Sequence, residues 1–488
     1  MVSLFTITSH PCRPTAHPLL SAFVAAALTF GGTGCVAQTT PQPTSPTAWP
    51  ATDDTPGSTS RSSTGTALRP GATPTATPNL PPAPPHRGMP VADIRGEPTV
   101  RVRVGSSLTK ATLGKPGDAL RIGAAQTHRN KKIYRYPAPV TIIRSGGAWE
   151  LTDATGARVR WRLPELNITH DTSGAISLGE KAYPRRIRLS PAGDAAARFH
   201  AINHVPLETY LAGVLERELY ASWPAETFRA QAVAARSYAL WEVSLARRTP
   251  GRVFDLESTE ASQVYGGVSK NPKALAAVHD TRGMLLVYDA RVLPAFFASS
   301  TGGLGQDAAL AFPGRGPDLP PLRAREQGAW DAQSPTYRWG PITRDSATLS
   351  RRIAAWGKAK KSAPHQALAK LGTLRQIAVA TLNRVKRPAS FRLTNNTGAT
   401  FILDAEGFRQ ACNFKAKGLP AIRKELRLLS SHVDVAASGS SIIFTHGHGH
   451  GHGVGMSQWG AKAMAQAGHK HAAILSFYYP GAALVRLY

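Results

Sequence analysis

Residues 38–90 contain almost no large apolar side chains and consist mainly of Pro, Thr, Ser and Ala. Segments such as TTPQPTSPTAWP and TPTATPNLPPAPPHRG cannot bury enough surface to offset the entropy that a chain loses on folding. We therefore expect a disordered tether, which its prolines keep extended. A folded body has to be built from residues 91–488 alone.

A short apolar run, LLSAFVAAALTF at residues 19–30, precedes this tether and is followed by small residues. It is too short to span a bilayer comfortably and has the position of a signal-peptide core, so residues 1–37 predict export to the cell envelope, either periplasm or cell wall. Two alternatives stay open. Cys35 is the lipidated cysteine of a lipoprotein, and hence a membrane tether, or the signal is cleaved near Ala37.

The chain has three cysteines, and two of them, Cys12 and Cys35, lie in or beside the signal segment. Too few remain for a disulfide framework or a cysteine-based zinc site, so we expect Cys412 to be a structural thiol.

Basic residues outnumber acidic ones by 58 to 30, which gives a formal net charge of +28. Such an excess favours a polyanionic partner, whether nucleic acid, an anionic membrane or an acidic wall polymer. The basic residues are scattered, however, and a solvated basic surface explains them equally well. Because the export signal argues against nucleic acid, we exclude it as a partner.

The residue patterns of the folded body predict an α+β fold. Val100, Val102 and Val104 alternate with arginines, as in a half-buried strand, and residues 139–161 combine apolar runs with Gly-Gly and Thr-Gly turns that are typical of hairpins. Further strands are expected at 186–189, 199–205, 284–288, 293–298, 377–382, 401–403 and 442–444, and helices at 225–245, 346–358, 457–467 and 471–478. We divide the body into a β-rich part (91–205), a core (206–304), a variable part (305–440) and a C-terminal part (441–488).

The stretch from Leu207 to Trp241 is where the sequence indicates a site. An apolar helical segment runs up to Glu218, a Trp-Pro turn follows, and an alanine-rich helix begins after Pro224. Glu218 stands beside apolar and aromatic residues, and the resulting desolvation would raise its pKa and suit a general acid. From the residues alone, a glutamate next to Arg217 is more often an ordinary surface residue.

Two segments then carry a family resemblance. YLAGVLERELYASWPAETFRAQAVAARSYAL resembles the first signature of the SpoIID/LytB family of bacterial cell-wall proteins, in which an acidic residue precedes a Trp-Pro turn and an A-Q-A-V-A-A-R-[TS]-Y-A helix. The tail GHGHGVGMSQWGAKAMAQAGHKHAAILSFYYPG resembles the second signature, G-H-G-V-G-M-S-Q-x-G-A…Y-Y-P-G. Between them QVYGG, TRGMLLVYD and SSTGG follow in family order.

The resemblance implies an exported peptidoglycan lytic transglycosylase without a cofactor. It would cleave the bond between N-acetylmuramic acid (MurNAc) and N-acetylglucosamine (GlcNAc), preferably in strands stripped of stem peptides, and sporulation is one family setting. The catalytic acid falls on Glu218, whereas the pattern tolerates other residues at Glu216. One carboxylate suffices, because Glu218 protonates the glycosidic oxygen and then takes the proton of the muramic O6 hydroxyl as a 1,6-anhydro ring closes.

The alternative is a LytB-like protein that binds peptidoglycan without cleaving it and stimulates an N-acetylmuramoyl-L-alanine amidase. For either function we assign substrate binding to polar residues of the signatures, although hydrogen bonds to neighbouring loops are the simplest interpretation for the first two. They are Gln231, Arg236, Ser300, His452, Ser457 and Gln458.

Two stretches of the sequence raise the question of a metal site. Some family members hold zinc through Cys and His just before Q-V-Y-x-G, but residues 255–267, DLESTEASQVYGG, contain neither. His446, His448, His450 and His452 alternate with glycine, and in an extended strand all four imidazoles would share a face and could meet on one ion. We favour a structural and cleft role for His452 and expect no functional metal.

Overall fold

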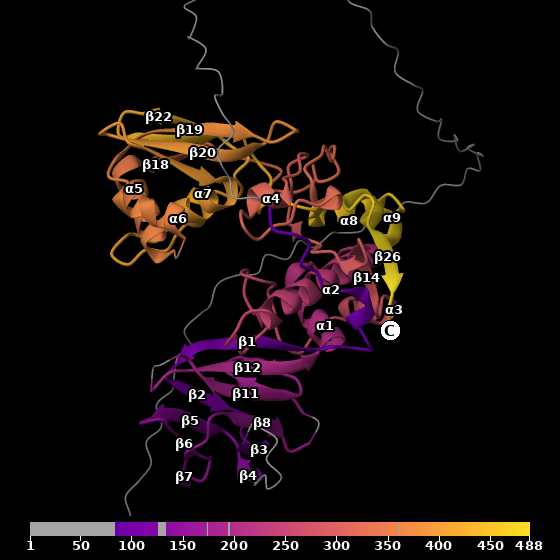
Figure 1. Ribbon diagram of the computed structural model, residues 1–488. Helices are drawn as coiled ribbons and strands as arrows, with labels where there is room; N and C mark the ends of the chain where they lie inside the picture. Colours follow the sequence, from indigo (N-terminus) through magenta and orange to yellow (C-terminus); the bar gives the residue numbers. More distant parts are fainter. Residues whose placement is uncertain (1–82, 125–132, 173, 194–195, 361) are drawn as a thin grey trace, which may run out of the picture. The chain divides into compact units, whose positions relative to one another are not determined.

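The computed structural model describes residues 83–124, 133–172, 174–193, 196–360 and 362–488 (Figure 1). The signal segment, Cys35 and almost all of the tether lie outside these residues. The described part mixes helices with several separate sheets, which confirms the α+β prediction. None of its helices has the length and apolar character needed to cross a membrane.

Two sheets form the β-rich N-terminal part (Figure 1). The seven-stranded sheet has the order β13 (Leu256–Glu257), β1 (Thr99–Leu108), β12 (Phe199–Pro206), β11 (Arg186–Pro191), β8 (Leu166–His170), β3 (Ala119–Ala124) and β4 (Ile133–Pro137). The six-stranded sheet has the order β10 (Lys181–Tyr183), β9 (Ile176–Leu178), β2 (Lys110–Leu113), β5 (Val140–Ser145), β6 (Ala148–Thr152) and β7 (Arg158–Trp161). Val100 and Val102 of β1 are fully buried, and β5, β6 and β7 form the antiparallel hairpins that the glycine turns predict.

Strand β12 leads directly into α1 (Leu207–Glu218), which is followed by α2 (Ala225–Arg247) and α3 (Pro272–Asp280). Helix α2 is buried on nearly all sides because its many alanines let other elements approach closely. Phe228 and Ala232 belong to the core that the helices share with the N-terminal sheets, whereas Val233 and Trp241 belong to a second core with the C-terminal segment. The alanine-rich helix therefore joins two cores.

The C-terminal segment folds back onto this helical layer. Strand β14 (Met284–Tyr288) lies between β15 (Arg291–Val292) and β26 (Ala483–Arg486), while β16 (Phe297–Ala298) pairs in parallel with β25 (Met456–Ser457). Helices α8 (Gln458–Gln466) and α9 (His471–Tyr478) lie where the sequence predicts them. The prediction of a strand at 293–298 is wrong for residues 293–296, which form short turns instead. Pro294 lacks the backbone N–H that a strand would donate to its neighbour.

The variable part has a core of its own (Figure 1). Its sheets are β18 (Ile342–Asp345), β23 (Ser441–Thr445) and β22 (Asp434–Ser438), and β19 (Leu374–Leu382), β20 (Pro388–Asn395) and β21 (Thr400–Asp404). Its helices are α5 (Ser346–Ala359), α6 (Ala363–Gln366) and α7 (Ala405–Cys412); α4 (Ala308–Ala311) and the two-stranded pair β17 (Arg338–Trp339) and β24 (Gly447–His448) connect it to the rest. Cys412 is a buried free thiol whose pKa burial raises to about 12, as expected of a structural cysteine.

Candidate active site

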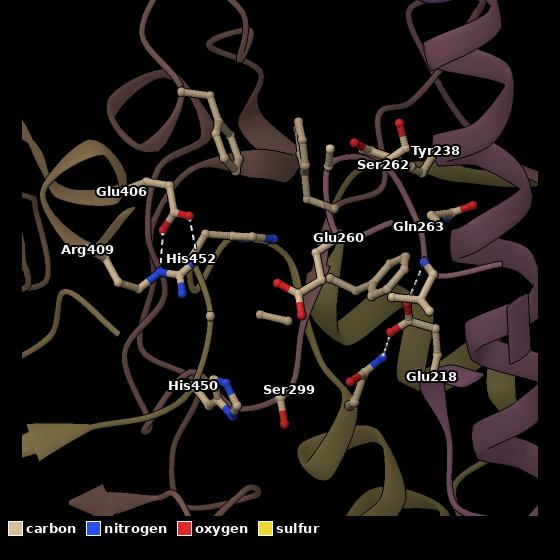
Figure 2. Close-up of a pocket in the computed structure, with 18 of the residues that line it drawn as sticks. Glu218, Tyr238, Glu260, Ser262, Gln263, Ser299, Glu406, Arg409, His450 and His452 are labelled. Atoms are coloured by element: carbon tan, nitrogen blue, oxygen red, sulfur yellow. Dashed lines mark hydrogen bonds and ion pairs between the residues drawn. The ribbon is translucent and has the colours of Figure 1, made fainter. Parts of the chain in front are cut away.

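Glu218 is the last residue of α1, and its carboxylate is held by two segments that are distant in sequence. The backbone N–H of Val264 donates to Oε1 over 3.3 Å, and Nε2 of Gln458 donates to Oε2 over 3.1 Å (Figure 2). Val264 belongs to the QVYGG loop and Gln458 to the C-terminal signature. The two signatures thus meet on one carboxylate.

The surroundings of Glu218 favour its protonated form. Burial raises the pKa of this carboxyl group above its ordinary value, and it outweighs the two donated hydrogen bonds, which lower the pKa. The negative charge of Glu260 raises the pKa further. Glu218 therefore keeps its proton to a higher pH than a free glutamate does, as a general acid requires.

Close packing fixes the loop that carries Val264. A Cβ atom added to Gly213 of α1 would lie 2.2 Å from the carbonyl oxygen of Gly267, so only glycine permits this contact. The buried amide of Gln263 accepts from the hydroxyl of Tyr210 over 3.0 Å and donates to the carbonyl of Ala235 over 3.2 Å. The loop is thereby bound to both α1 and α2.

A buried carboxylate, Asp331, fixes the segment that carries Gln458. Its Oδ2 accepts from the hydroxyls of Ser300 (2.8 Å) and Ser457 (3.0 Å) and from the N–H of Thr301 (2.7 Å) and of Gly302 (3.0 Å). The SSTGG loop and the start of α8 are therefore joined through one side chain, which is only 2% exposed.

Glu218 lines a pocket of about 420 Å³. In Figure 2 the pair Glu406–Arg409 stands across the pocket from Glu218, and Glu260 lies between them in this view. The other lining residues are Tyr238, Ala261, Ser262, Gln263, Val264, Phe296, Phe297, Ala298, Ser299, Phe312, Arg315, Gln410, His450, Gly451, His452 and Gln458. The core, the variable part and the C-terminal segment therefore all contribute residues to the lining of the pocket.

Helix α7 of the variable part supplies an ion pair to the pocket. Arg409 donates to both carboxylate oxygens of Glu406, over 2.8 Å and 2.6 Å. Burial alone would raise the pKa of Glu406, but the guanidinium outweighs it and the pKa is lowered. The pair therefore remains charged beside the pocket, where it can bind polar groups of a ligand.

The four imidazoles of the glycine-histidine tract go to different places. Gly449, Gly451, Gly453 and Gly455 all have positive φ, so the tract is not the extended strand that would align the histidines on one face. His446 binds Asp434 over 3.0 Å, His448 stacks on His432, and His450 and His452 line the pocket. Nowhere in the described part do three or more His, Cys, Asp or Glu residues form a group that could hold a metal ion.

His452 is the innermost of these histidines. Its ring lies edge-on to Phe296 and Phe312, and its Nδ1 accepts the N–H of Val454 over 3.0 Å, which places the remaining proton on Nε2. Burial lowers the pKa of His452 to about 4, so the ring is neutral near pH 7. The structural and cleft role assigned to His452 stays a prediction, and a neutral ring of this kind can offer its Nε2–H to a ligand in the pocket.

Of the residues assigned to the site from the sequence, Glu218, His452 and Gln458 line the pocket. Ser300 and Ser457 are instead hydrogen-bonded to Asp331 in the interior. Arg236 is fully buried in a bidentate ion pair with Glu208, over 2.9 and 2.6 Å, and Gln231 is fully buried with no protein hydrogen-bond partner among the described residues. Substrate contact by these four stays a prediction that nothing in their surroundings favours.

The sequence reasoning missed Glu260, Asp331, Glu406 and Arg409. Glu260 lies just before QVYGG, where the family pattern marks only zinc ligands, and the other three belong to the variable part, which lacks a clear motif. No local pattern marks any of them, because their roles arise from contacts with distant segments.

The part of the chain that carries Glu218 is similar to known proteins. Residues 195–288, which contain both Glu218 and Val264, match the family model of stage II sporulation protein SpoIID. This part of the chain is therefore similar to the SpoIID family, and relatives named stage II sporulation protein D and amidase enhancer support the SpoIID/LytB resemblance and a cell-wall related role.

Three relatives illustrate the relationship. An uncharacterized protein of Brachyspira hyodysenteriae is 28% identical over 324 residues, which cover 65% of this chain and 76% of the relative. The amidase enhancer of Bacillus subtilis is 30% identical over 300 residues (56% and 40%), and stage II sporulation protein D of Bacillus amyloliquefaciens is 28% identical over 332 residues (64% and 84%). The chain thus matches less than half of the amidase enhancer.

Proposed function

We propose that the protein is an exported peptidoglycan lytic transglycosylase that cleaves the MurNAc–GlcNAc bond of glycan strands and leaves 1,6-anhydro-MurNAc ends. One observation carries the proposal: the two family signatures converge on Glu218, a half-buried carboxyl group with a raised pKa at the edge of a pocket. A protonated carboxyl group in this place can donate to a glycosidic oxygen.

The hydrogen bonds of Glu218 suit both halves of the reaction. In the first, the carboxyl proton passes to the glycosidic oxygen as the bond to the muramic C1 breaks. In the second, the carboxylate takes the proton of the O6 hydroxyl as O6 bonds to C1. Gln458 can serve both states, because its amide donates through Nε2 to the carboxylate and, after a half turn, accepts through Oε1 from the carboxylic acid.

Because the pocket also contains a second carboxylate, Glu260, the reaction product has to distinguish ring closure from hydrolysis. In a hydrolase a second carboxylate activates water or attacks the sugar, whereas ring closure by the substrate's own hydroxyl needs neither. Glu260 is exposed, and its charge raises the pKa of Glu218. We therefore assign Glu260 an electrostatic role.

The test is product analysis on glycan strands freed of stem peptides, with the purified full chain. Mass spectrometry should find anhydromuramic ends, and Glu218→Gln should abolish them. Glu425→Gln is the matched control, because Glu425 is an exposed glutamate that lies outside the pocket and should be dispensable. Reducing ends that disappear in Glu260→Gln would contradict ring closure and indicate hydrolysis, and a wild-type chain that releases nothing would contradict an enzymatic role.

The second candidate function is a non-catalytic enhancer of a wall amidase, which the 30% identity to a protein named amidase enhancer favours. The chain would then bind peptidoglycan and associate with an N-acetylmuramoyl-L-alanine amidase. Purified sacculi, an amidase and the chain would be combined, and the release of stem peptides measured. Equal stimulation by the wild type and Glu218→Gln, without anhydromuramic products, would favour the enhancer over the transglycosylase.

Both functions require export, which we propose from the N-terminal segment. Mass spectrometry of the N-terminus of the chain isolated from its envelope fraction tests this. A lipidated Cys35 or an N-terminus near residue 37 is expected, and an intact N-terminus in the cytoplasm would contradict export.

A further inference from the structure

A second pocket of about 360 Å³ adjoins the first one at Glu218. Glu218, Ser299 and Gln458 line both pockets, so the candidate catalytic carboxylate lies where the two pockets meet. The second pocket is otherwise lined by Glu216, Arg217, Leu219, Tyr220, Trp223 and Trp459. A chain-like ligand that passes Glu218 would occupy both.

Three aromatic rings in mutual contact form one side of this second pocket. The ring centroids are 5.5 Å apart for Tyr220 and Trp223, 5.0 Å for Trp223 and Trp459, and 6.3 Å for Tyr220 and Trp459. Lys462 lies on the tryptophans, with Nζ 4.5 Å from the ring centroid of Trp459. The indole rings therefore have neighbours that fix their orientation.

Tyr220 differs from the two tryptophans in its exposure. It is 64% exposed, the highest value among the exposed large hydrophobic side chains of the described part, whereas Trp223 is 5% exposed. If the cluster served only to close the core, the phenol ring would be expected to be covered as well. Tyr220 instead presents its ring to solvent two residues after Glu218, on a base that the tryptophans hold in place.

An exposed, preoriented aromatic ring with polar neighbours has the chemistry of a sugar-binding surface. The C–H face of a pyranose is apolar and packs on an aromatic face, while its equatorial hydroxyls need polar partners at the rim. Here Glu216 offers carboxylate oxygens and Arg217 offers guanidinium donors, and both side chains are exposed at the pocket.

We propose that the aromatic pocket is a glycan subsite, in which Tyr220 stacks on an N-acetylhexosamine ring on one side of the bond that Glu218 protonates. The proposal rests on the proposed function for its choice of substrate. It implies that a productive glycan extends across both pockets and that Tyr220 contributes to binding rather than to proton transfer.

The test measures binding without turnover, in the full chain carrying Glu218→Gln. Tri-N-acetylchitotriose is the probe, and tryptophan fluorescence reports its binding because Trp223 and Trp459 line the pocket. Adding Tyr220→Ala should weaken the affinity about three- to ten-fold, as expected for the loss of one stacked ring, while Tyr220→Phe should stay within about two-fold. Tyr134→Ala is the matched control, because Tyr134 is an exposed tyrosine of β4 that lines neither pocket and should change nothing.

An affinity that Tyr220→Ala leaves unchanged would overturn the proposal, and so would a parent that does not bind chitotriose. An unchanged melting temperature of Tyr220→Ala separates lost stacking from lost folding. The proposed function is tested separately, by measuring anhydromuramic ends produced by the protein that retains Glu218. Weakened binding without any such ends would keep the subsite and refute the reaction, whereas normal ends with an unchanged affinity would refute the subsite alone.

Discussion

Replacing Gln458 by methionine should shift the pH dependence of the reaction upward. Gln458 donates to Oε2 of Glu218 over 3.1 Å, and methionine has a similar length but cannot donate. The substitution therefore removes one of the two hydrogen bonds that stabilise the ionised carboxylate and leaves the one from Val264. Because the protonated form gains relative to the ionised form, the pKa of Glu218 rises.

The size of the shift follows from the difference between two hydrogen bonds. A hydrogen bond to an ionised group contributes about 1.5–3 kcal/mol, and one between neutral groups about 0.5–1.5 kcal/mol. The Gln458→Met variant loses the stronger bond when Glu218 is ionised and the weaker bond when Glu218 is protonated. The ionised form is therefore destabilised relative to the protonated form by about 1–1.5 kcal/mol. At 1.36 kcal/mol per unit, the pKa of Glu218 should rise by about one unit.

The assay is the pH profile of kcat/KM for anhydromuramic product formation. Activity requires protonated Glu218 in the free enzyme, so the profile falls as the pH rises through its pKa, and this alkaline limb should move up by about one pH unit. Gln231→Met is the matched control. Gln231 is a fully buried glutamine of α2 that lines neither pocket, and its replacement should leave the limb in place.

Two results would refute this reasoning. An alkaline limb that moves to lower pH would mean that Gln458 stabilises the protonated carboxyl group more than the ionised one. A limb that stays fixed, in a variant with unchanged folding, would mean that a group other than Glu218 is the titrating acid.

Three further substitutions test the scaffold of the site. Glu218→Gln should raise the free energy of unfolding at pH 7, since a carboxyl group whose pKa is raised on folding opposes folding above its unfolded pKa. Urea titration should show the gain disappearing near about pH 4, where the unfolded carboxyl group is protonated, and a gain that persists there would contradict this sign. Gly213→Ala places a Cβ atom 2.2 Å from the carbonyl oxygen of Gly267 and should destabilise the protein by about 1–3 kcal/mol. It should also lower kcat, because the loop that carries Val264 has to shift. A variant with wild-type stability and kinetics would show that this contact does not fix the loop. Arg236→Ala leaves the carboxylate of Glu208 buried without its guanidinium partner and should lower the free energy of unfolding by about 3–5 kcal/mol. A variant that has wild-type stability but binds glycan more weakly would show instead that Arg236 is a binding residue.

The sequence by itself determined the local elements and the catalytic candidate. Alternating valines gave β1, the alanine-rich pattern gave α2, and the tail gave α9 with the bounds that the structure has. These patterns succeed because the 2.0- and 3.6-residue periods are set by backbone geometry within one segment. Glu218 and Gln458 are identified by the family motifs, because hydrophobic periodicity does not mark functional residues.

Only the tertiary structure decided how the site is assembled. It brought Val264 and Gln458 onto one carboxylate, placed Arg409 of the variable part in the pocket wall, and sent the four histidines to separate neighbours. It also turned Tyr220 outward onto two tryptophans. Such contacts join residues up to 240 positions apart, and they depend on how whole elements pack rather than on what each segment prefers locally.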